Sequence, residues 1–265
     1  MNKDWIYQQT LHNVSQWDKI MEHKYPEVKE WNNDGNKYFI QVCEKCNFLD
    51  ATKVIDFDKF LNDNSTVIDL GCGGGWLSAY LSRFEKVKII LAIDTSKNYL
   101  YNILPTVIKI LKGKSEKIVP VEGLFSPLML EDNSVDLIVA SAAFHHAFNL
   151  EELFKETYSK LKKGGYLIVL NETPISGYLY IKRIIKAFIK ILYKVLKRQY
   201  ESPSPKISVN GFEYDPYLGD KNYPFWYWER AIKEADFELV EIIDTNLTTV
   251  KNVKSDKLIH FVCKK

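Results

Sequence analysis

The sequence predicts an α/β fold with a mostly parallel sheet, and two observations support this prediction. Short apolar runs alternate with segments of helical periodicity through the middle of the chain. Strands that alternate with helices form parallel sheets, because each helix crosses back over the sheet before the next strand begins. The length of 265 residues, with 46% apolar and 26% charged residues, also suits one globular α/β domain with additions.

Five apolar runs are the expected parallel strands: Val67–Asp69, Lys88–Asp94, Ile118–Val121, Leu137–Ala140 and Tyr166–Leu170. Helical segments should start at Trp76, Lys97 and Leu150. Pro105 should bend or split the second helix, because proline lacks the N–H that an inner helical turn needs. Residues 225–265 indicate a helix followed by two strands, and strands joined by a short link pair in antiparallel fashion.

A glycine-rich turn after the first strand is the strongest functional signal. Asp69 lies in the strand, and Gly71, Gly73 and Gly75 follow it in VIDLGCGGGWLSAYLS. Glycine lets the backbone turn sharply and approach a ligand, and the N–H groups that start the next helix face the same point. A dinucleotide site of the type G-x-G-x-x-G needs a third small residue, but bulky Trp76 stands there. The pattern D-x-G-x-G-x-G therefore indicates a different nucleotide; the alternative is an ordinary tight turn.

Together with three later motifs in the same order, this turn resembles that of the class I S-adenosylmethionine (SAM) dependent methyltransferases that act on small molecules. LAID ends at Asp94, LEDNSVDLIVASAAFHH ends at His146 and resembles the segment around the fourth strand, and LKKGGYLIVLNE ends at Glu172 and resembles the fifth strand. The resemblance covers roughly residues 64–170. It implies a Rossmann-like, seven-stranded, mostly parallel sheet with an antiparallel last strand. It also implies SAM as the cofactor.

The resemblance implies that SAM is held by Asp69, Gly71, Cys72, Gly73, Gly75, Trp76, Asp94, Thr95, Leu124, Phe125 and Ser141. Asp94 is expected to accept hydrogen bonds from both ribose hydroxyls. Leu124 departs from the family pattern, because many members have an aspartate there that binds the adenine amino group. We expect backbone groups of Leu124 and Phe125 to take over this role.

We divide the single domain into four parts: a helical cap (1–62), a SAM-binding core (63–174), a helical lid inserted after the fifth strand (175–224), and a C-terminal helix with a strand pair (225–265). N-terminal helices commonly cover the cofactor in the family that the chain resembles.

The insertion contains a basic amphipathic helix. Its apolar residues recur at i, i+3, i+4 and i+7, and lysine and arginine fill the other positions, with no acid between Glu172 and Glu201. Either the apolar stripe packs on the domain as a lid, or residues 178–200 lie on an anionic membrane surface. We favour the lid, whose basic residues would suit a phosphorylated substrate.

Catalysis needs an acceptor atom aligned with the methyl carbon, and a base only if the acceptor must lose a proton. His145 and His146 follow the fourth strand at its carboxyl end, where open α/β sheets bind ligands. One is the expected base, while the other should pack beneath the strand, because adjacent side chains diverge. We expect Glu172 to orient a substrate hydroxyl or to pair with a histidine; the alternative is a helix-capping or surface acid. Expected substrate contacts, or else lid core, are Tyr178, Tyr214, Tyr223 and Trp226.

Charge and cysteine content narrow the function classes. The net charge of +2 creates no overall basic field, and the N/D-P-P-Y motif of amino methylation is absent after the fourth strand, so we expect no nucleic-acid partner. Cys43 and Cys46 supply only half of a zinc site, and Cys72 and Cys263 belong to other elements, so we expect reduced thiols and no metal. With no long apolar run and a polar N-terminal segment, we expect a cytoplasmic protein.

The expected function is methyl transfer from SAM to an oxygen of a small molecule, such as a sugar or a phosphorylated or nucleotide-activated precursor of a surface polysaccharide. The abundance of lysine, isoleucine, asparagine and tyrosine is typical of A+T-rich bacterial genomes. Two alternatives are a membrane-associated lipid or quinone methyltransferase and a non-catalytic SAM-fold partner protein. The intact glycine turn and Asp94 argue against the second alternative.

Overall fold

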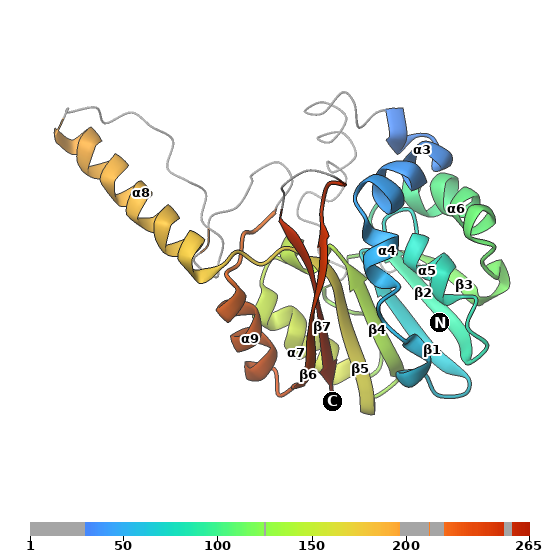
Figure 1. Cartoon of the computed structure of the whole chain (residues 1–265). Coiled ribbons are helices and arrows are strands. Elements are labelled where there is room, and N and C mark those ends of the chain that lie inside the picture. The colour runs from blue at the N-terminus through green and yellow to red at the C-terminus, as the bar shows by residue number, and fades with distance from the viewer. Residues whose placement is uncertain (1–29, 125, 197–211, 213–219, 252–255) are drawn as a thin grey trace.

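A seven-stranded sheet organises the chain, with strand order β3-β2-β1-β4-β5-β7-β6 (Figure 1). The computed structural model describes residues 30–124, 126–196, 212, 220–251 and 256–265. The strands are β1 Ser65–Leu70, β2 Val87–Asp94, β3 Ile118–Glu122, β4 Val135–Ser141, β5 Leu161–Glu172, β6 Glu238–Thr248 and β7 Lys257–Lys264.

Strand directions confirm the predicted α/β class. The pairs β1–β2, β1–β4, β2–β3 and β4–β5 are parallel, whereas β7 is antiparallel to both β5 and β6. All five predicted parallel strands are present. The largest difference is that β5 begins at Leu161 instead of Tyr166, because Leu161 already pairs with Val135 across an irregularity in the register.

The helices also follow the predicted order. The longer ones are α5 Trp76–Leu81, α6 Leu104–Leu111, α7 Leu150–Lys160, α8 Gly177–Leu196 and α9 Phe225–Glu234. Pro105 splits the second predicted helix as expected: a π-helical turn covers Tyr99–Ile103, and α6 follows with the proline in its first turn, where a missing N–H costs nothing. In the described part of the N-terminal cap, the helical segments are α3 Gly35–Phe39, a π-helical turn Ile40–Lys45 and α4 Phe48–Thr52.

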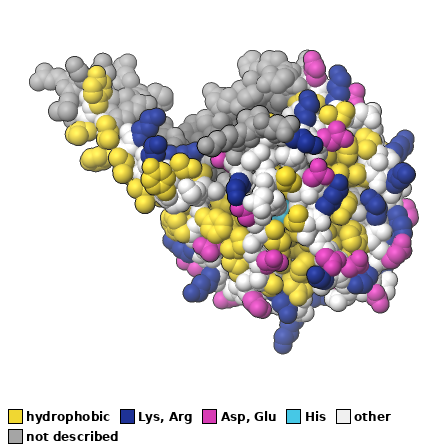
Figure 2. Space-filling view, in the orientation of Figure 1, with side chains coloured by type: hydrophobic (Ala, Val, Ile, Leu, Met, Phe, Trp, Pro, Cys, Tyr) yellow, Lys and Arg dark blue, Asp and Glu magenta, His cyan; other side chains and the backbone are white. Residues whose placement is uncertain are grey.

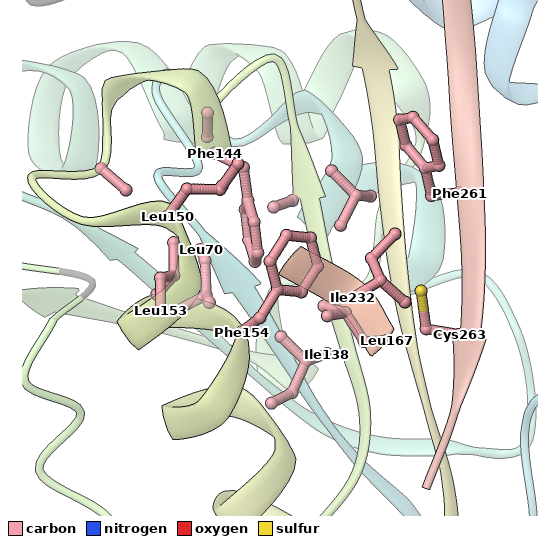
Figure 3. Close-up of a cluster of buried hydrophobic side chains, with 14 of the residues drawn as sticks. Leu70, Ile138, Phe144, Leu150, Leu153, Phe154, Leu167, Ile232, Phe261 and Cys263 are labelled. Atoms are coloured by element: carbon pink, nitrogen blue, oxygen red, sulfur yellow. The ribbon is translucent and has the colours of Figure 1, made fainter. Parts of the chain in front are cut away.

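Each face of the sheet has its own hydrophobic core, because successive side chains of a strand point to opposite faces. Ile68 and Leu70 of β1 pack with residues of α7 and α9, whereas Val67 of the same strand packs with residues of α3, α5 and α6. Figure 3 shows the first cluster, in which Phe154 of α7 lies close to the sheet residues Ile138 and Leu167. This packing fixes the carboxyl ends of β1, β4 and β5, where the candidate site lies.

The helix α8 extends away from the body of the protein (Figure 1). The sequence predicts this amphipathic helix, but its apolar stripe does not pack on the domain as a lid would. Ile181 is 58% exposed, Ile184 50% and Phe188 66%. No helix among the described residues is both long enough and apolar enough to cross a bilayer.

Candidate functional site

The glycine-rich turn joins β1 to α5 in a conformation that only glycine adopts easily. Gly71, Gly73 and Gly75 have φ angles of 63°, 53° and 72°. A Cβ atom on Gly75 would lie 2.1 Å from the Leu104 Cδ1 atom, so α6 also requires glycine there. Asp94, at the end of β2, accepts hydrogen bonds from the Gly73 N–H at 2.8 Å and, through its other oxygen, from the Ser96 N–H at 2.8 Å. The predicted ribose-binding acid therefore holds the turn as well.

Tyr38 of α3 is a contact of this turn that sequence reasoning missed. Its hydroxyl accepts a hydrogen bond of 2.8 Å from the Gly74 N–H, and a Cβ on Gly74 would lie 2.5 Å from the tyrosine ring. Burial raises the pKa of Tyr38 well above its usual value, so the phenol stays neutral. The side chain of Asp34 accepts hydrogen bonds from the first N–H groups of α3 and fixes its start. The side chain of Tyr38 thus connects the described part of the cap to the glycine turn.

Asp69 places a buried carboxyl at the floor of this region. Its exposed fraction is 1%, and the Ser78 hydroxyl donates a hydrogen bond of 2.7 Å to it. Burial raises the pKa of Asp69 to about 7, well above that of an unfolded aspartate. Because the folded state holds the proton more tightly, the contribution of Asp69 to stability is lost as pH rises towards 7. A cationic ligand group nearby would favour the ionised form.

A cavity lies beside the turn. Six predicted cofactor residues line it: Asp69, Gly71, Cys72, Gly73, Trp76 and Ser141. Five lining residues were not predicted: Tyr38, Val42, Phe48, Leu77 and Ala142. Within the described residues, the predicted contacts that do not line this cavity are Gly75, Asp94, Thr95 and Leu124. Phe125 lies outside the described residues.

A buried carboxylate and a histidine form a second cluster at the ends of β4 and β5. Glu172 is fully buried and accepts hydrogen bonds from the N–H groups of Ala143 at 3.1 Å and Phe144 at 2.9 Å. Its other oxygen lies 2.7 Å from the Nδ1 atom of His145. Of the alternatives for Glu172, the structure therefore has the pairing with a histidine and not the surface acid.

The partners of His145 define its proton state. Because Glu172 accepts at Nδ1, the neutral imidazole carries its proton there, and Nε2 is left as an acceptor. Burial alone lowers the pKa of His145, but the charge of Glu172, the hydrogen bond to it and the charge of Asp220 outweigh burial. The pKa of His145 is therefore raised above its usual value. This arrangement can accept a proton at Nε2 and stabilise the resulting imidazolium.

His146 does not pack beneath the strand, so the expectation that the two histidines diverge is wrong. Their ring centroids lie 4.1 Å apart, and Asp220 Oδ1 is 3.1 Å from His146 Nδ1 and 3.7 Å from His145 Nε2. The cause is local: Phe144–His146 form a 3₁₀ turn after β4, so alternation along a strand no longer applies. These two rings and the Asp220 carboxylate form a group of three possible metal ligands, although we expected no metal from the sequence.

Lys221 adds a cation beside the histidines. Its Nζ atom donates a hydrogen bond of 3.2 Å to the His146 carbonyl, and its backbone N–H donates one of 3.2 Å to the His145 carbonyl. Burial lowers the pKa of Lys221 to about 8, and the charge of Asp220 opposes this fall. Sequence reasoning missed Asp220 and Lys221, because no local motif marks them.

A second cavity is lined by His145, Glu172, Thr173, Asp220, Lys221, Asn222, Tyr223 and Trp228. Tyr223 is the one predicted substrate contact in this lining. Tyr178 is 73% exposed on α8, and Trp226 packs against Tyr180. Tyr214 lies outside the described residues. The two cavities are linked along the chain. Ala142 lines the first cavity, and the N–H group of the next residue, Ala143, donates a hydrogen bond to Glu172, which lines the second.

Asn171 holds the ends of β4 and β5 in this position. Its side-chain amide donates to the Ser141 hydroxyl at 2.9 Å, and its backbone N–H donates to His260 Nδ1 at 3.0 Å. The Nε2 atom of His260 lies 2.9 Å from the Ala51 carbonyl and donates to it, and burial lowers the pKa of His260, so the ring is neutral. The strand end therefore connects to both β7 and the cap.

The cysteines show no zinc-like arrangement among the described residues. All four are free thiols, and the buried ones lie apart along the chain: Cys43 in the π-helical turn of the cap, Cys72 in the glycine turn and Cys263 in β7. The group of possible metal ligands found in the described part of the chain contains no cysteine.

We predict that Tyr38→Phe weakens SAM binding. The change removes the acceptor of the Gly74 N–H while the ring stays, and an unsatisfied buried donor costs roughly 1–3 kcal/mol. Affinity measured by calorimetry should fall by about tenfold, at a free-energy cost of about 1.4 kcal/mol. Tyr101→Phe, at a 53% exposed position, is the matched control and should bind as the unchanged protein does. Equal affinity of the Tyr38 variant would mean that the turn does not need this bond.

Comparisons with known proteins agree with this geometry. Residues 68–169 match the model of a family described as a methyltransferase domain. A methyltransferase of Schizosaccharomyces pombe, described as uncharacterized, is 34% identical over 114 residues, which are 43% of this chain and 41% of that protein. A sterol 24-C-methyltransferase of Pneumocystis carinii is 31% identical over 111 residues, which are 40% of this chain and 27% of that protein. The matches thus span less than half of either relative.

Solved structures share the fold over most of the chain. An S-adenosylmethionine-dependent methyltransferase from Mesorhizobium loti superposes with a TM-score of 0.55 at 15% identity, and the match covers 84% of this chain and 100% of that one. At this level of identity the similarity shows a common fold.

Proposed function

We propose that this chain, which contains a class I SAM-dependent methyltransferase domain, transfers a methyl group from SAM to an oxygen atom of a small-molecule acceptor. The observation that carries the proposal is the pair of His145 and the buried Glu172, which line a cavity at the ends of β4 and β5, while Ser141 at the end of β4 lines the cavity of the glycine turn. A hydroxyl acceptor needs such a base, because it must lose its proton as the new bond forms.

The first cavity fits SAM by its chemistry. Asp69 in its lining offers a carboxyl with a pKa of about 7 to a cationic group. Asp94, which holds the glycine turn at the end of β2, is the proposed acceptor for the ribose hydroxyls, because a carboxylate oxygen can accept more than one hydrogen bond. SAM, when bound there, supplies a methyl group made electrophilic by its sulfonium.

In the second cavity, His145 acts as the general base. Its Nε2 atom takes the proton of the acceptor hydroxyl and later releases it to water. With SAM bound, the acceptor oxygen would gain the methyl group as the bond from that methyl to sulfur breaks, and S-adenosylhomocysteine would leave. Glu172 keeps the proton of the neutral ring on Nδ1 and offsets the positive charge that develops. Glu172 is thus a positioning residue.

Lys221 favours an anionic acceptor such as a phosphorylated or nucleotide-activated sugar. With a pKa of about 8 it is mostly protonated at neutral pH, although the neighbouring Asp220 offsets part of its attraction. The exposed apolar face of α8 favours a second candidate, a lipid or quinone acceptor. Release of S-adenosylhomocysteine with panels of both acceptor classes distinguishes them. If the protein binds SAM but releases no S-adenosylhomocysteine with any hydroxyl acceptor, the result would support the non-catalytic alternative.

We predict that Asp94→Ala weakens SAM binding by at least about tenfold. The change removes the acceptor of the Gly73 and Ser96 N–H groups together with the proposed ribose contacts, and each hydrogen bond to a charged group contributes about 1.5–3 kcal/mol. Calorimetry measures the affinity. Asp132→Ala removes a surface acid that pairs with Lys160 and serves as the control. If the Asp94 variant binds SAM as well as the unchanged protein, this cofactor assignment is wrong.

A further inference from the structure

The helix α8 presents an apolar face that the described structure leaves exposed. Ile181, Ile184, Ile185, Phe188 and Leu192 have exposed fractions between 50% and 66%. At about 100° per residue these five positions fall within an arc of about 100° on the helix. Figure 2 shows this row of yellow side chains along α8, away from the body of the protein. The apolar surface is therefore continuous along one face.

The described basic residues of α8 lie outside this apolar arc, on a side that also exposes Leu179, Ile189 and Tyr193. Lys182, Arg183 and Lys186 lie outside the apolar arc and are exposed. The sequence has no aspartate or glutamate between Glu172 and Glu201, so nothing within the helix neutralises these charges. A matching surface must accept apolar side chains and carry negative charge beside them. The interface of a bilayer that contains anionic lipids has both properties.

The first turn of α8 packs against the domain, whereas its later turns extend away from the sheet. The ring of Tyr180 lies 6.0 Å from that of Phe212 and 6.2 Å from that of Trp226 on α9. Beyond this contact α8 continues to Leu196, and its whole length of 20 residues corresponds to roughly 30 Å. A helix of this length that starts on the domain can lie flat on a surface while the domain stays in water.

We propose that α8 binds the surface of an anionic lipid bilayer. The apolar face enters the boundary between headgroups and acyl chains, and the lysine and arginine side chains extend to the lipid phosphates. Thr173, three residues before Ser176, lines the candidate acceptor cavity, and α8 begins directly after Ser176, so this contact brings that cavity near the bilayer. The proposal concerns lipid binding alone and does not depend on methyl transfer.

Flotation with vesicles tests the proposal directly. The full-length protein is mixed with vesicles of phosphatidylcholine alone or with added phosphatidylglycerol, at physiological ionic strength. We expect it to float with the anionic vesicles, to release as salt is raised, and to bind neutral vesicles much more weakly. Phe188→Glu should abolish flotation, because it puts a carboxylate in the centre of the apolar face.

Charge reversal on the basic side gives a graded second test. Each basic residue near an anionic surface contributes about 1 kcal/mol, so Lys182→Glu and Lys186→Glu should each weaken binding by at least about fivefold. Tyr101→Glu and Lys233→Glu are matched controls at exposed positions outside α8 and should float as the unchanged protein does. Because the altered side chains are exposed, we expect all variants to have the melting temperature of the unchanged protein. Equal melting temperatures would show that the variants are folded.

Two results would overturn the proposal. One is that the unchanged protein stays in solution with anionic vesicles at physiological salt. The other is a protein that does not bind vesicles but forms dimers in sedimentation experiments, with the dimers lost in Phe188→Glu. That result would assign this face to a second copy of the chain.

Discussion

His145→Gln is expected to lower methyl-transfer turnover by about 10²-fold or more while leaving SAM affinity nearly unchanged. The change removes the proposed base and its Nε2 acceptor from the second cavity. The first cavity keeps its lining, because His145 is not part of it. Initial rates at saturating SAM measure turnover, and calorimetry measures cofactor affinity.

His146→Gln is the matched control for this experiment. His146 contacts Asp220 but does not line the second cavity, so its replacement should reduce turnover much less. Unchanged turnover in both single variants would remove the base from the mechanism. It would indicate an acceptor that is already anionic, such as a carboxylate or phosphate oxygen.

Much of the fold could be predicted from the sequence, because local patterns determine it. Apolar runs of β1 to β5 bury both faces, the glycines of the turn need positive φ, and Pro105 cannot lie inside a regular helix. The position of Asp94 could also be predicted, because it is the last residue of an apolar strand. In each case the physical cause lies within a few residues of the effect.

Contacts between distant segments could not be predicted in this way. Tyr38 binds Gly74 across 36 positions, and an aromatic residue in a short helix has no pattern that names its partner. Asp220 and Lys221 come to the histidines from the insertion without any motif. The amphipathic pattern of α8 indicates which face is apolar, but the same pattern fits a buried lid and an exposed face.

The pH dependence of turnover should report the pair of His145 and Glu172. The pKa of His145 is raised in the folded protein, and only the neutral ring can accept a proton, so turnover should rise as pH increases through this pKa. The effect on stability has the opposite sign. Interactions of the protonated ring with Glu172 stabilise the fold fully below the unfolded histidine pKa of about 6.5 and are lost as pH rises through the folded pKa.

Glu172→Gln is expected to lower turnover by about 10²-fold or more, although it barely changes the shape of the side chain. The glutamine oxygen can still accept from the Ala143 and Phe144 N–H groups, but its NH₂ group then faces Nδ1 of His145. A donor at this position requires Nδ1 to accept, so the ring proton moves to Nε2 and blocks the atom that should take the substrate proton. Initial rates at saturating SAM measure the loss.

Three further measurements separate this tautomer effect from structural damage. Glu172→Asp keeps the charge and should recover part of the turnover, whereas Glu85→Gln, at an exposed acid, should behave as the unchanged protein does. SAM affinity should stay nearly constant in all three variants, because Glu172 does not line the first cavity. The rising limb of the pH profile for the Gln variant should move to lower pH, because the charge that raises the pKa of His145 is gone. If Glu172→Gln keeps most of its turnover while His145→Gln loses it, then Glu172 supports the fold of the turn and does not set the proton state of the base.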